Sequence, residues 1–222
     1  MYGCKYCGNS CIRKGWQCQR QKLFCKTCCK HQQFTYSERK LTTKHERDAV
    51  FLNNEGCSVS SISRIIGFSK TTVCNIIDRL GILIQLIPPV ESNQDYEVDE
   101  LKTFVGNKKN ESWIMYSLNK ATKKIISFCV GRRTKENIRK ITDSLIKLSP
   151  KSIRTDKLNI YPALIPKEIH KYKNKVTNHI ERKNLHFRQQ LRRLQRKTIC
   201  YSKSERMLRN SIALFVFSLT KQ

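Results

Sequence analysis

Four cysteines near the start of the chain are spaced in a way that suits metal binding. Cys4-x-x-Cys7 is followed, after seventeen intervening residues, by Cys25-x-x-Cys28. Each pair can give two thiolates to one tetrahedral zinc ion. The bound ion would then stabilise a segment that is too short to form a hydrophobic core of its own. The alternative is chance spacing of free thiols. We expect zinc at these four positions, and four other side chains have no assigned role: Cys11, Cys18, Cys29 and His31.

Acidic residues are scarce in this chain, so those near apolar, strand-like segments stand out. Asp99 and Glu100 lie in one such segment, and alternation along a strand sends them to opposite faces. Asp156 ends another short strand, and Glu181 lies in a segment with helical periodicity. Carboxylates from two strands and a helix could hold divalent ions for phosphoryl transfer. Each acid alone is also compatible with a cap or turn.

The segment around Glu181 has the pattern of a helix that packs against a core. Glu181 and Arg188 are seven residues apart, which places them two turns apart on the same face. That face borders an apolar stripe, formed by Ile180, Phe187, Leu191 and Leu194. A helix of this kind could present a carboxylate and a guanidinium group at one edge of the core.

The charge of the chain indicates a polyanion as partner. Lys and Arg outnumber Asp and Glu by 44 to 17, a formal net charge of +27, and the basic residues run through most of the chain. We expect double-stranded DNA, although a ribosomal or membrane-surface protein would share this charge. No apolar run approaches the roughly 20 residues that cross a bilayer. We therefore expect no membrane partner and a cytoplasmic, nucleoid-associated protein.

Two helices are predicted after the cysteine-rich segment. The first has its apolar residues on one face: Val59, Ile62, Ile65 and Ile66. Gly67-Phe68-Ser69 supplies a tight turn, and Ser69 would cap a second helix over residues 70–80. The outward side of that helix suits a DNA major groove, with Lys70, Thr71, Thr72, Asn75 and Arg79 as candidate DNA-binding residues. An ordinary helical hairpin would show the same pattern.

The remaining chain reads as a mixed α/β domain. Four strands are predicted: Tyr96–Val105, Ser112–Asn119, Lys124–Arg132 and Ser152–Asp156. A helix is predicted over residues 136–148, and helical structure from Val176 onward. We therefore expect a multidomain α+β chain with a zinc-ribbon module at 1–38, a helix-turn-helix at 39–86, a linker at 87–95 and an α/β catalytic domain at 96–222.

Taken together, these motifs resemble the transposases of the insertion sequence one family. The matching segments are the two cysteine pairs, Asp99-Glu100 with Phe104-Val105-Gly106, Thr155-Asp156, residues 180–188 and Ser202-Lys-Ser204. The resemblance covers nearly the full chain. It implies a zinc ribbon, a helix-turn-helix and a catalytic domain with a ribonuclease-H-like fold, assembled as a homo-oligomer on DNA.

The same resemblance implies a set of roles. Asp99, Asp156 and Glu181 would bind magnesium or manganese as a catalytic triad, assisted by Asn184 and Arg188. Arg188 and Arg192 are further candidate DNA contacts. The reaction would be nicking at the terminal inverted repeats, then attack of the freed 3'-hydroxyl on target DNA. Two rivals are a zinc-containing regulator with an inactive C-terminal domain and a metal-dependent nuclease that cuts without joining.

Overall fold

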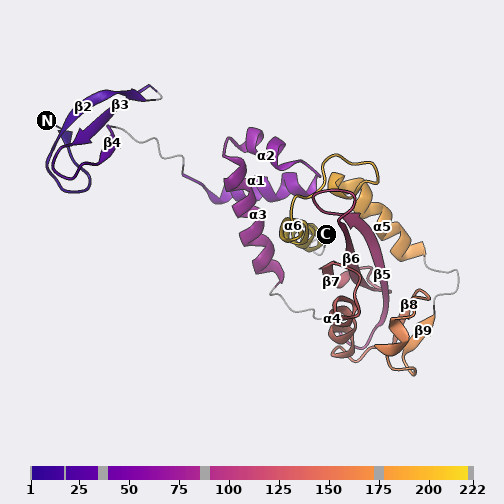
Figure 1. Cartoon of the computed structure of the whole chain (residues 1–222). Coiled ribbons are helices and arrows are strands. Elements are labelled where there is room, and N and C mark those ends of the chain that lie inside the picture. Colours follow the sequence, from indigo (N-terminus) through magenta and orange to yellow (C-terminus); the bar gives the residue numbers. More distant parts are fainter. Residues whose placement is uncertain (1, 18, 35–39, 86–90, 173–177, 220–222) are drawn as a thin grey trace. The chain divides into compact units, whose positions relative to one another are not determined.

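The computed structural model of the chain describes residues 2–17, 19–34, 40–85, 91–172 and 178–219 (Figure 1). It divides into two compact units, Met1–Thr42 and Thr43–Gln222. The expected module boundaries at 38/39 and 86/87 lie outside the described residues, as do Cys18 and Val176. Within the described ranges, no helix is long and apolar enough to cross a membrane.

The first unit is a small antiparallel sheet with strand order β1-β2-β3-β4. The strands are β1 (Tyr2–Gly3), β2 (Ser10–Gln17), β3 (Arg20–Cys25) and β4 (His31–Gln33). Its buried core consists of Leu23 and three cysteines, Cys4, Cys11 and Cys25. Because so little apolar surface is available, the stability of this unit must depend on what the cysteines bind.

The second unit begins with three helices, α1 (Thr43–Asn54), α2 (Val59–Ile66) and α3 (Lys70–Gln85). Gly67 ends α2 in a left-handed conformation with φ of 73°, as a tight turn requires. The Ser69 hydroxyl accepts a hydrogen bond from the backbone N–H of Thr72 at 3.1 Å, which confirms the predicted cap.

The predicted apolar face of α2 is wrong at one position. Ile62 is fully buried, whereas the side chain of Ile65 is 63% exposed. At 100° per residue, Ile65 lies 60° from Ile62, on the side away from Val59 and Ile66. Those two residues are partly buried against the core that α1, α2 and α3 share. A short amphipathic helix can therefore leave one of its isoleucines in solvent.

Helix α3 packs closely against the last helix, α6 (Glu205–Leu219). Leu214 of α6 completes the core of the three N-terminal helices, so these helices and the rest of the unit share buried surface. A Cβ atom on Gly81 would lie 2.6 Å from Cβ and 2.8 Å from the backbone oxygen of Asn210. Only glycine permits this approach of the two helices.

We expect Gly81→Ala to lower the free energy of unfolding of the second unit by about 1–3 kcal/mol, because the added methyl group overpacks the contact with α6. Chemical denaturation followed by circular dichroism would measure this loss. Ile82→Ala is a suitable control, since Ile82 is 48% exposed on the same helix and its loss should matter little. Equal stability of the two variants would contradict the close contact.

A five-stranded sheet forms the centre of the second unit. Its order is β7-β6-β5-β8-β9, with antiparallel pairs among β5, β6 and β7 and parallel pairs from β5 to β8 and from β8 to β9. The strands are β5 (Asp95–Phe104), β6 (Glu111–Asn119), β7 (Ile125–Gly131), β8 (Ser152–Thr155) and β9 (His170–Tyr172). The four predicted strands are confirmed, and β9 was not predicted.

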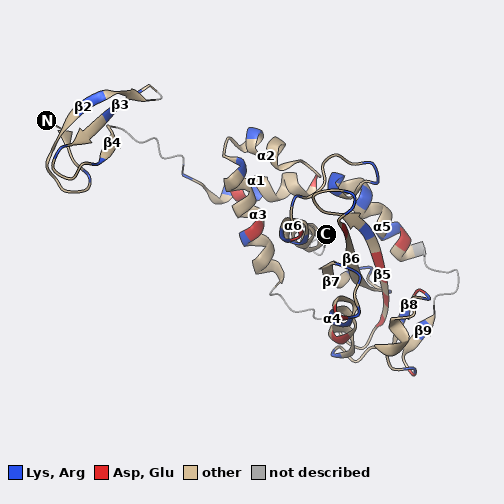
Figure 2. Cartoon of the chain, viewed as in Figure 1, with Lys and Arg blue, Asp and Glu red and all other residues tan. Residues whose placement is uncertain are grey.

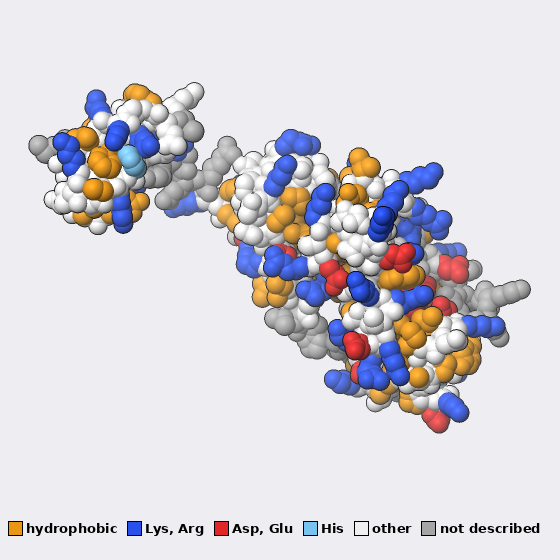
Figure 3. All heavy atoms as spheres, viewed as in Figure 1, with side chains coloured by type: hydrophobic (Ala, Val, Ile, Leu, Met, Phe, Trp, Pro, Cys, Tyr) orange, Lys and Arg blue, Asp and Glu red, His pale blue; other side chains and the backbone are white. Residues whose placement is uncertain are grey.

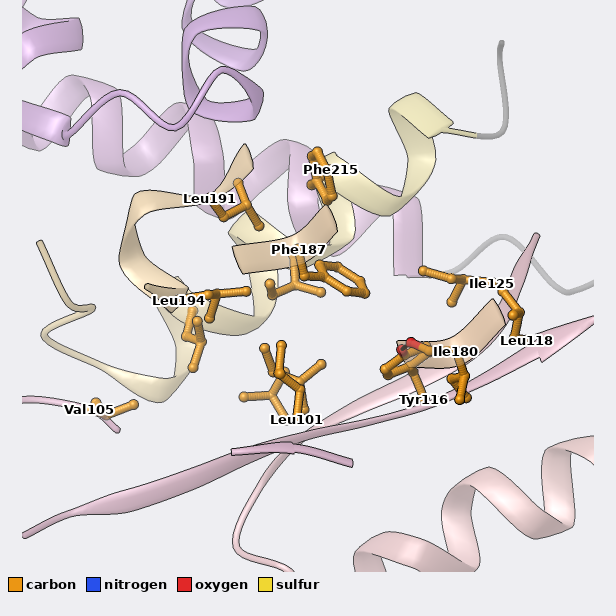
Figure 4. Packing of buried hydrophobic residues seen from close by; sticks show 14 residues of the cluster. Leu101, Val105, Tyr116, Leu118, Ile125, Ile180, Phe187, Leu191, Leu194 and Phe215 are labelled. Carbon is orange, nitrogen blue, oxygen red and sulfur yellow. Dashed lines mark hydrogen bonds between the residues drawn. The ribbon is translucent and has the colours of Figure 1, made fainter. Parts of the chain in front are cut away.

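Helices cover both faces of this sheet. Helix α4 (Lys135–Ile146) packs on one face, close to the predicted bounds. Helices α5 (Asn178–Gln190) and α6 pack on the other, where Ile180 and Phe187 of α5 meet Leu101 and Tyr116 (Figure 4). The prediction of helical structure from Val176 onward holds for α5 and α6 and is wrong between them, where the helical part is the 3-10 turn Arg192–Leu194.

Candidate functional site

The four cysteines predicted as ligands lie together in the first unit. The Sγ atoms of Cys4 and Cys28 are 3.5 Å apart, as are those of Cys7 and Cys25. All four Sγ atoms lie within 4.8 Å of one another. Zinc–sulfur bonds of about 2.3 Å place the sulfurs of a tetrahedral site about 3.8 Å apart. The donor set and its spacing therefore fit a zinc ion.

Backbone amides favour the thiolate form that a metal needs at two of these cysteines, Cys4 and Cys25, whereas burial raises the pKa of Cys28 to about 12. The N–H of Tyr6 donates to Sγ of Cys4 at 3.4 Å. Backbone hydrogen bonding, chiefly from Cys28, lowers the pKa of Cys25 to about 6. Hydrogen bonding from Tyr6 likewise lowers the pKa of Cys4. These donors orient the sulfurs before any ion arrives.

The neighbouring cysteines and the histidine stand apart from this cluster. Cys11 is buried beside it, and burial raises the pKa of its thiol to about 11, so it remains protonated. Cys29 and His31 are exposed, and the ring of His31 lies 4.8 Å from that of Phe24. Among the described residues, the cluster with metal-binding geometry contains none of these three.

Most of the predicted DNA-facing residues of α3 are on the surface. Lys70, Thr71, Asn75 and Arg79 are exposed, and Thr72 is partly buried. The Thr72 hydroxyl lies 2.9 Å from that of Ser69, so it belongs to the helix cap. Arg79 forms an ion pair with Glu46 of α1 at 2.5 Å. An exposed pair of this kind is weak and can be exchanged for another anion.

Asp99 lies on the central strand β5, and hydrogen bonds hold both of its carboxylate oxygens. Its Oδ1 accepts from the backbone N–H of Glu100 at 2.8 Å, and its Oδ2 accepts from Nδ2 of Asn184 at 3.0 Å. The Tyr116 hydroxyl donates to Oδ1 of Asn184 at 2.9 Å, which fixes the amide with its nitrogen toward Asp99. The α5 helix is thus joined to the strand at this carboxylate.

Glu100 points to the opposite face of β5, as alternation predicts. The Tyr161 hydroxyl, in the 3-10 turn Tyr161–Ala163, donates a hydrogen bond to Oε1 of Glu100. Burial raises the pKa of Glu100 to about 7, and the nearby charges of Asp156 and Asp99 add to this rise. The three carboxyl groups therefore share one electrostatic environment, and the Glu100–Tyr161 pair was not predicted from the sequence.

Asp156 follows strand β8 directly. Its Oδ1 accepts a hydrogen bond from the backbone N–H of Leu158 at 3.0 Å, an arrangement that starts a turn. Strand β8 runs parallel to β5, with Glu97 paired to Arg154. Asp99 is two residues beyond Glu97 and Asp156 is two residues beyond Arg154, so both acids lie past the same end of the paired segment. Parallel pairing thus brings acids that are far apart in the sequence to the same side of the domain.

The residues predicted for the site on and just after α5 differ in exposure and in hydrogen bonding. Glu181 is exposed in the first turn of α5. Helix α5 carries both acidic and basic residues (Figure 2). Arg188 donates from Nη1 to the carbonyl of Leu194 at 2.8 Å and from Nη2 to that of Lys102 at 3.2 Å. Arg192 is exposed. Arg188 therefore links α5 to β5. Both of these hydrogen-bond partners are backbone carbonyls, so neither neutralises the charge of the guanidinium group.

Carboxylates are suitable ligands for a divalent cation, but the carboxylates of Asp99, Asp156 and Glu181 do not form as close a group as the four cysteine sulfurs. Within the described ranges, the cysteines alone form a set of three or more potential ligands within 4.8 Å of one another. Glu97 lies two residues before Asp99 on the same strand face, is 1% exposed, and neither carboxylate oxygen has a described hydrogen-bond partner. Buried, unpaired carboxylate oxygens call for a cation or a proton nearby.

Comparison with known proteins adds a family relationship. The sequence model of the family described as IS1 transposase matches residues 95–219. Insertion element iso-IS1n protein InsB of Shigella dysenteriae is 33% identical over 120 residues, which cover 54% of this chain and 92% of that protein. Insertion element IS1 2 protein InsB of Escherichia coli strain K12 is 31% identical over 108 residues, 49% of this chain and 65% of that protein.

A solved structure was also matched. It is a cryo-electron microscopy structure of a simian T-cell lymphotropic virus intasome in complex with the PP2A regulatory subunit B56 gamma. The match has a TM-score of 0.32 and 16% sequence identity, and covers 76% of this chain and 65% of that chain. Similarity at this level supports no conclusion about the fold.

Proposed function

The chain belongs to the IS1 transposase family, and we propose that it binds the terminal inverted repeats of its element and catalyses metal-dependent DNA cleavage and strand transfer. The observation that carries this proposal is the hydrogen bond between Asn184 and Asp99, at 3.0 Å, inside the segment that matches the family. It joins the helix that carries Glu181 to the strand beside Asp156.

The architecture supports two finer assignments. We propose that α2 and α3 form a helix-turn-helix, since Gly67 and Ser69 shape the turn and polar side chains of α3 face solvent. We also propose a ribonuclease-H-like catalytic domain. Three antiparallel strands followed by two parallel ones, with helices on both faces, support that fold.

We assign Asp99, Asp156 and Glu181 as the ligands of magnesium or manganese. Such ions, when bound, activate the attacking oxygen and stabilise the leaving oxygen of phosphoryl transfer. Glu181 lies one helical turn before Asn184, so the two residues share the side of α5 that contacts Asp99. The side chain of Glu181 is exposed and therefore accessible to a metal ion from solvent.

The other proposed site residues orient these acids and the DNA. Asn184, fixed by Tyr116, holds Oδ2 of Asp99 in one direction. Arg188 has donors beyond those bound to its two carbonyl partners, and its positive charge favours a phosphate near the edge of the sheet. Exposed Arg192 adds charge shortly after α5.

The proposed partners follow from the same reasoning. The four cysteines would hold zinc in a ribbon that contributes to DNA binding, and basic residues are spread over the visible surface (Figure 3). Cleavage and joining at two element ends need more than one protomer, so we propose a homo-oligomer on DNA. A protein with these partners would be associated with the nucleoid.

We expect the chain to nick and join duplexes that carry its own terminal inverted repeats when magnesium is added. Gel analysis of labelled DNA would measure both products. End binding without any cleavage would instead indicate a zinc-containing regulator, and cleavage without joining would indicate a nuclease. A duplex with scrambled ends is the control, and equal reaction on it would contradict end recognition.

A further inference from the structure

A hollow of about 450 Å³ lies along one side of α5, and the proposed site does not use it. It is lined by Leu118, Lys123, His179, Arg182, Lys183 and His186. Leu118 belongs to β6, Lys123 lies in the turn between β6 and β7, and the other four come from α5. Five of the six side chains are thus basic or can become so, and none is acidic.

This hollow is on the side of α5 opposite Asn184. Residues three, four and seven positions apart share one side of a helix, and this applies to His179, Arg182, Lys183 and His186. The buried stripe of Ile180 and Phe187 lies against the sheet (Figure 4). By helical spacing, this stripe lies between the basic side and the side that carries Asn184. One side of α5 therefore carries Asn184, which contacts Asp99, and the opposite side carries the basic residues of the hollow.

The positive charges in the hollow form no ion pair within the part of the chain that the structure describes. Among the described residues, no ion pair involves Lys123, Arg182 or Lys183. Lys123 donates a hydrogen bond to the carbonyl of Lys120, which leaves its charge in place. Burial lowers the pKa of Lys183, and burial together with Lys183 lowers that of His186. A bound anion would offset the cost of gathering these groups.

We propose that this hollow binds phosphate groups of a DNA backbone, separate from the phosphate that reacts beside Asp99. A guanidinium, two ammonium groups and two imidazoles are suited to phosphate oxygens. The open shape of the hollow offers no enclosed pocket for a small molecule. The inference rests on the proposed DNA function, and it gives α5 a DNA contact on each flank.

The test is DNA binding by the full chain as a function of salt. We expect Arg182→Gln with Lys183→Gln to weaken binding to a duplex about tenfold and to reduce the slope of log affinity against log salt by about two, because each lost phosphate contact contributes about 0.9. Fluorescence anisotropy with a labelled duplex would measure both quantities. Circular dichroism would verify that the variant is folded.

Two further variants distinguish phosphate binding in the hollow from a general effect of the net positive charge on DNA affinity. Arg139→Gln with Lys147→Gln removes the same charges from two exposed positions across the sheet, one on α4 and one at its C-cap, and should leave the slope unchanged. Arg182→Lys with Lys183→Arg keeps the charge and should bind like wild type. An equal loss in the α4 variant, or no loss in the α5 variant, would overturn the inference. Failure of the wild-type chain to bind DNA at all would instead contradict the proposed function.

Discussion

We expect Asp156→Ala to reduce magnesium-dependent cleavage and joining of terminal inverted-repeat DNA by at least about a thousandfold, equivalent to about 4 kcal/mol of transition-state stabilisation. The variant would lose one of the carboxylates that we assign to the metal, and an ion that is missing or displaced cannot stabilise the reacting oxygens. Zinc content and DNA binding should be retained, because the cysteines belong to the other unit and the exposed polar residues of α3 are unchanged.

Asp156 also starts a turn, and its charge must be tested apart from that role. Asp156→Asn keeps an oxygen that can accept the hydrogen bond from the N–H of Leu158, yet it removes the charge. We expect this variant to be as inactive as Asp156→Ala. Asp143→Ala removes an exposed carboxylate from α4 and should keep wild-type activity. Wild-type cleavage by both Asp156 variants would remove this residue from the active-site assignment.

The parts of the structure that the sequence predicts are those fixed by local patterns. The two Cys-x-x-Cys pairs predict one cluster because a tetrahedral zinc ion takes four thiolates and each pair supplies two. Alternation along β5 predicts that Asp99 and Glu100 face opposite sides, and their partners Asn184 and Tyr161 lie on those two sides. The cap at Ser69 follows from residue chemistry alone.

The parts that could not be predicted depend on contacts between distant segments. Strand β9 has three residues, too few for an alternating pattern, and it forms because β8 offers it a parallel edge. The break after α5 arises where the Arg193 guanidinium donates to Ser202 and to Asn53 of α1, a contact 140 residues apart in sequence. Tyr161 likewise reaches Glu100 only after the sheet has formed.

These long-range contacts also connect the proposed DNA-reading helices to the catalytic side of the unit. Asn53 of α1 accepts hydrogen bonds from Arg193, just after α5, and from Ser211 of α6. Gln85 and Asp78 of α3 both bond to Asn210 of α6. Because buried polar groups are costly when unpaired, this network holds α1 and α3 in a defined position against α6. The proposed helix-turn-helix and the proposed catalytic residues therefore belong to one packed unit.

We expect removal of zinc to abolish end-specific DNA binding while the second unit stays folded. The first unit has four buried core residues, three of them cysteines, so its folding free energy must come mainly from metal binding, which for structural zinc is about 10–16 kcal/mol. The second unit has three hydrophobic clusters of its own. A strong chelator should therefore lower affinity for terminal repeats to that for random duplex, with helical circular dichroism largely retained.

Two cysteine variants make this expectation specific to the cluster. Cys25→Ser removes one of the four grouped sulfurs, so zinc content should fall and end-specific binding should be lost with it. Cys29→Ser changes an exposed cysteine four positions later that is outside the group, and it should keep both properties. Zinc released per chain and anisotropy with terminal-repeat duplex would measure the two effects. Full end-specific binding by metal-free chain would mean that α3 alone reads the ends, and the cysteine unit would then have a role other than DNA recognition.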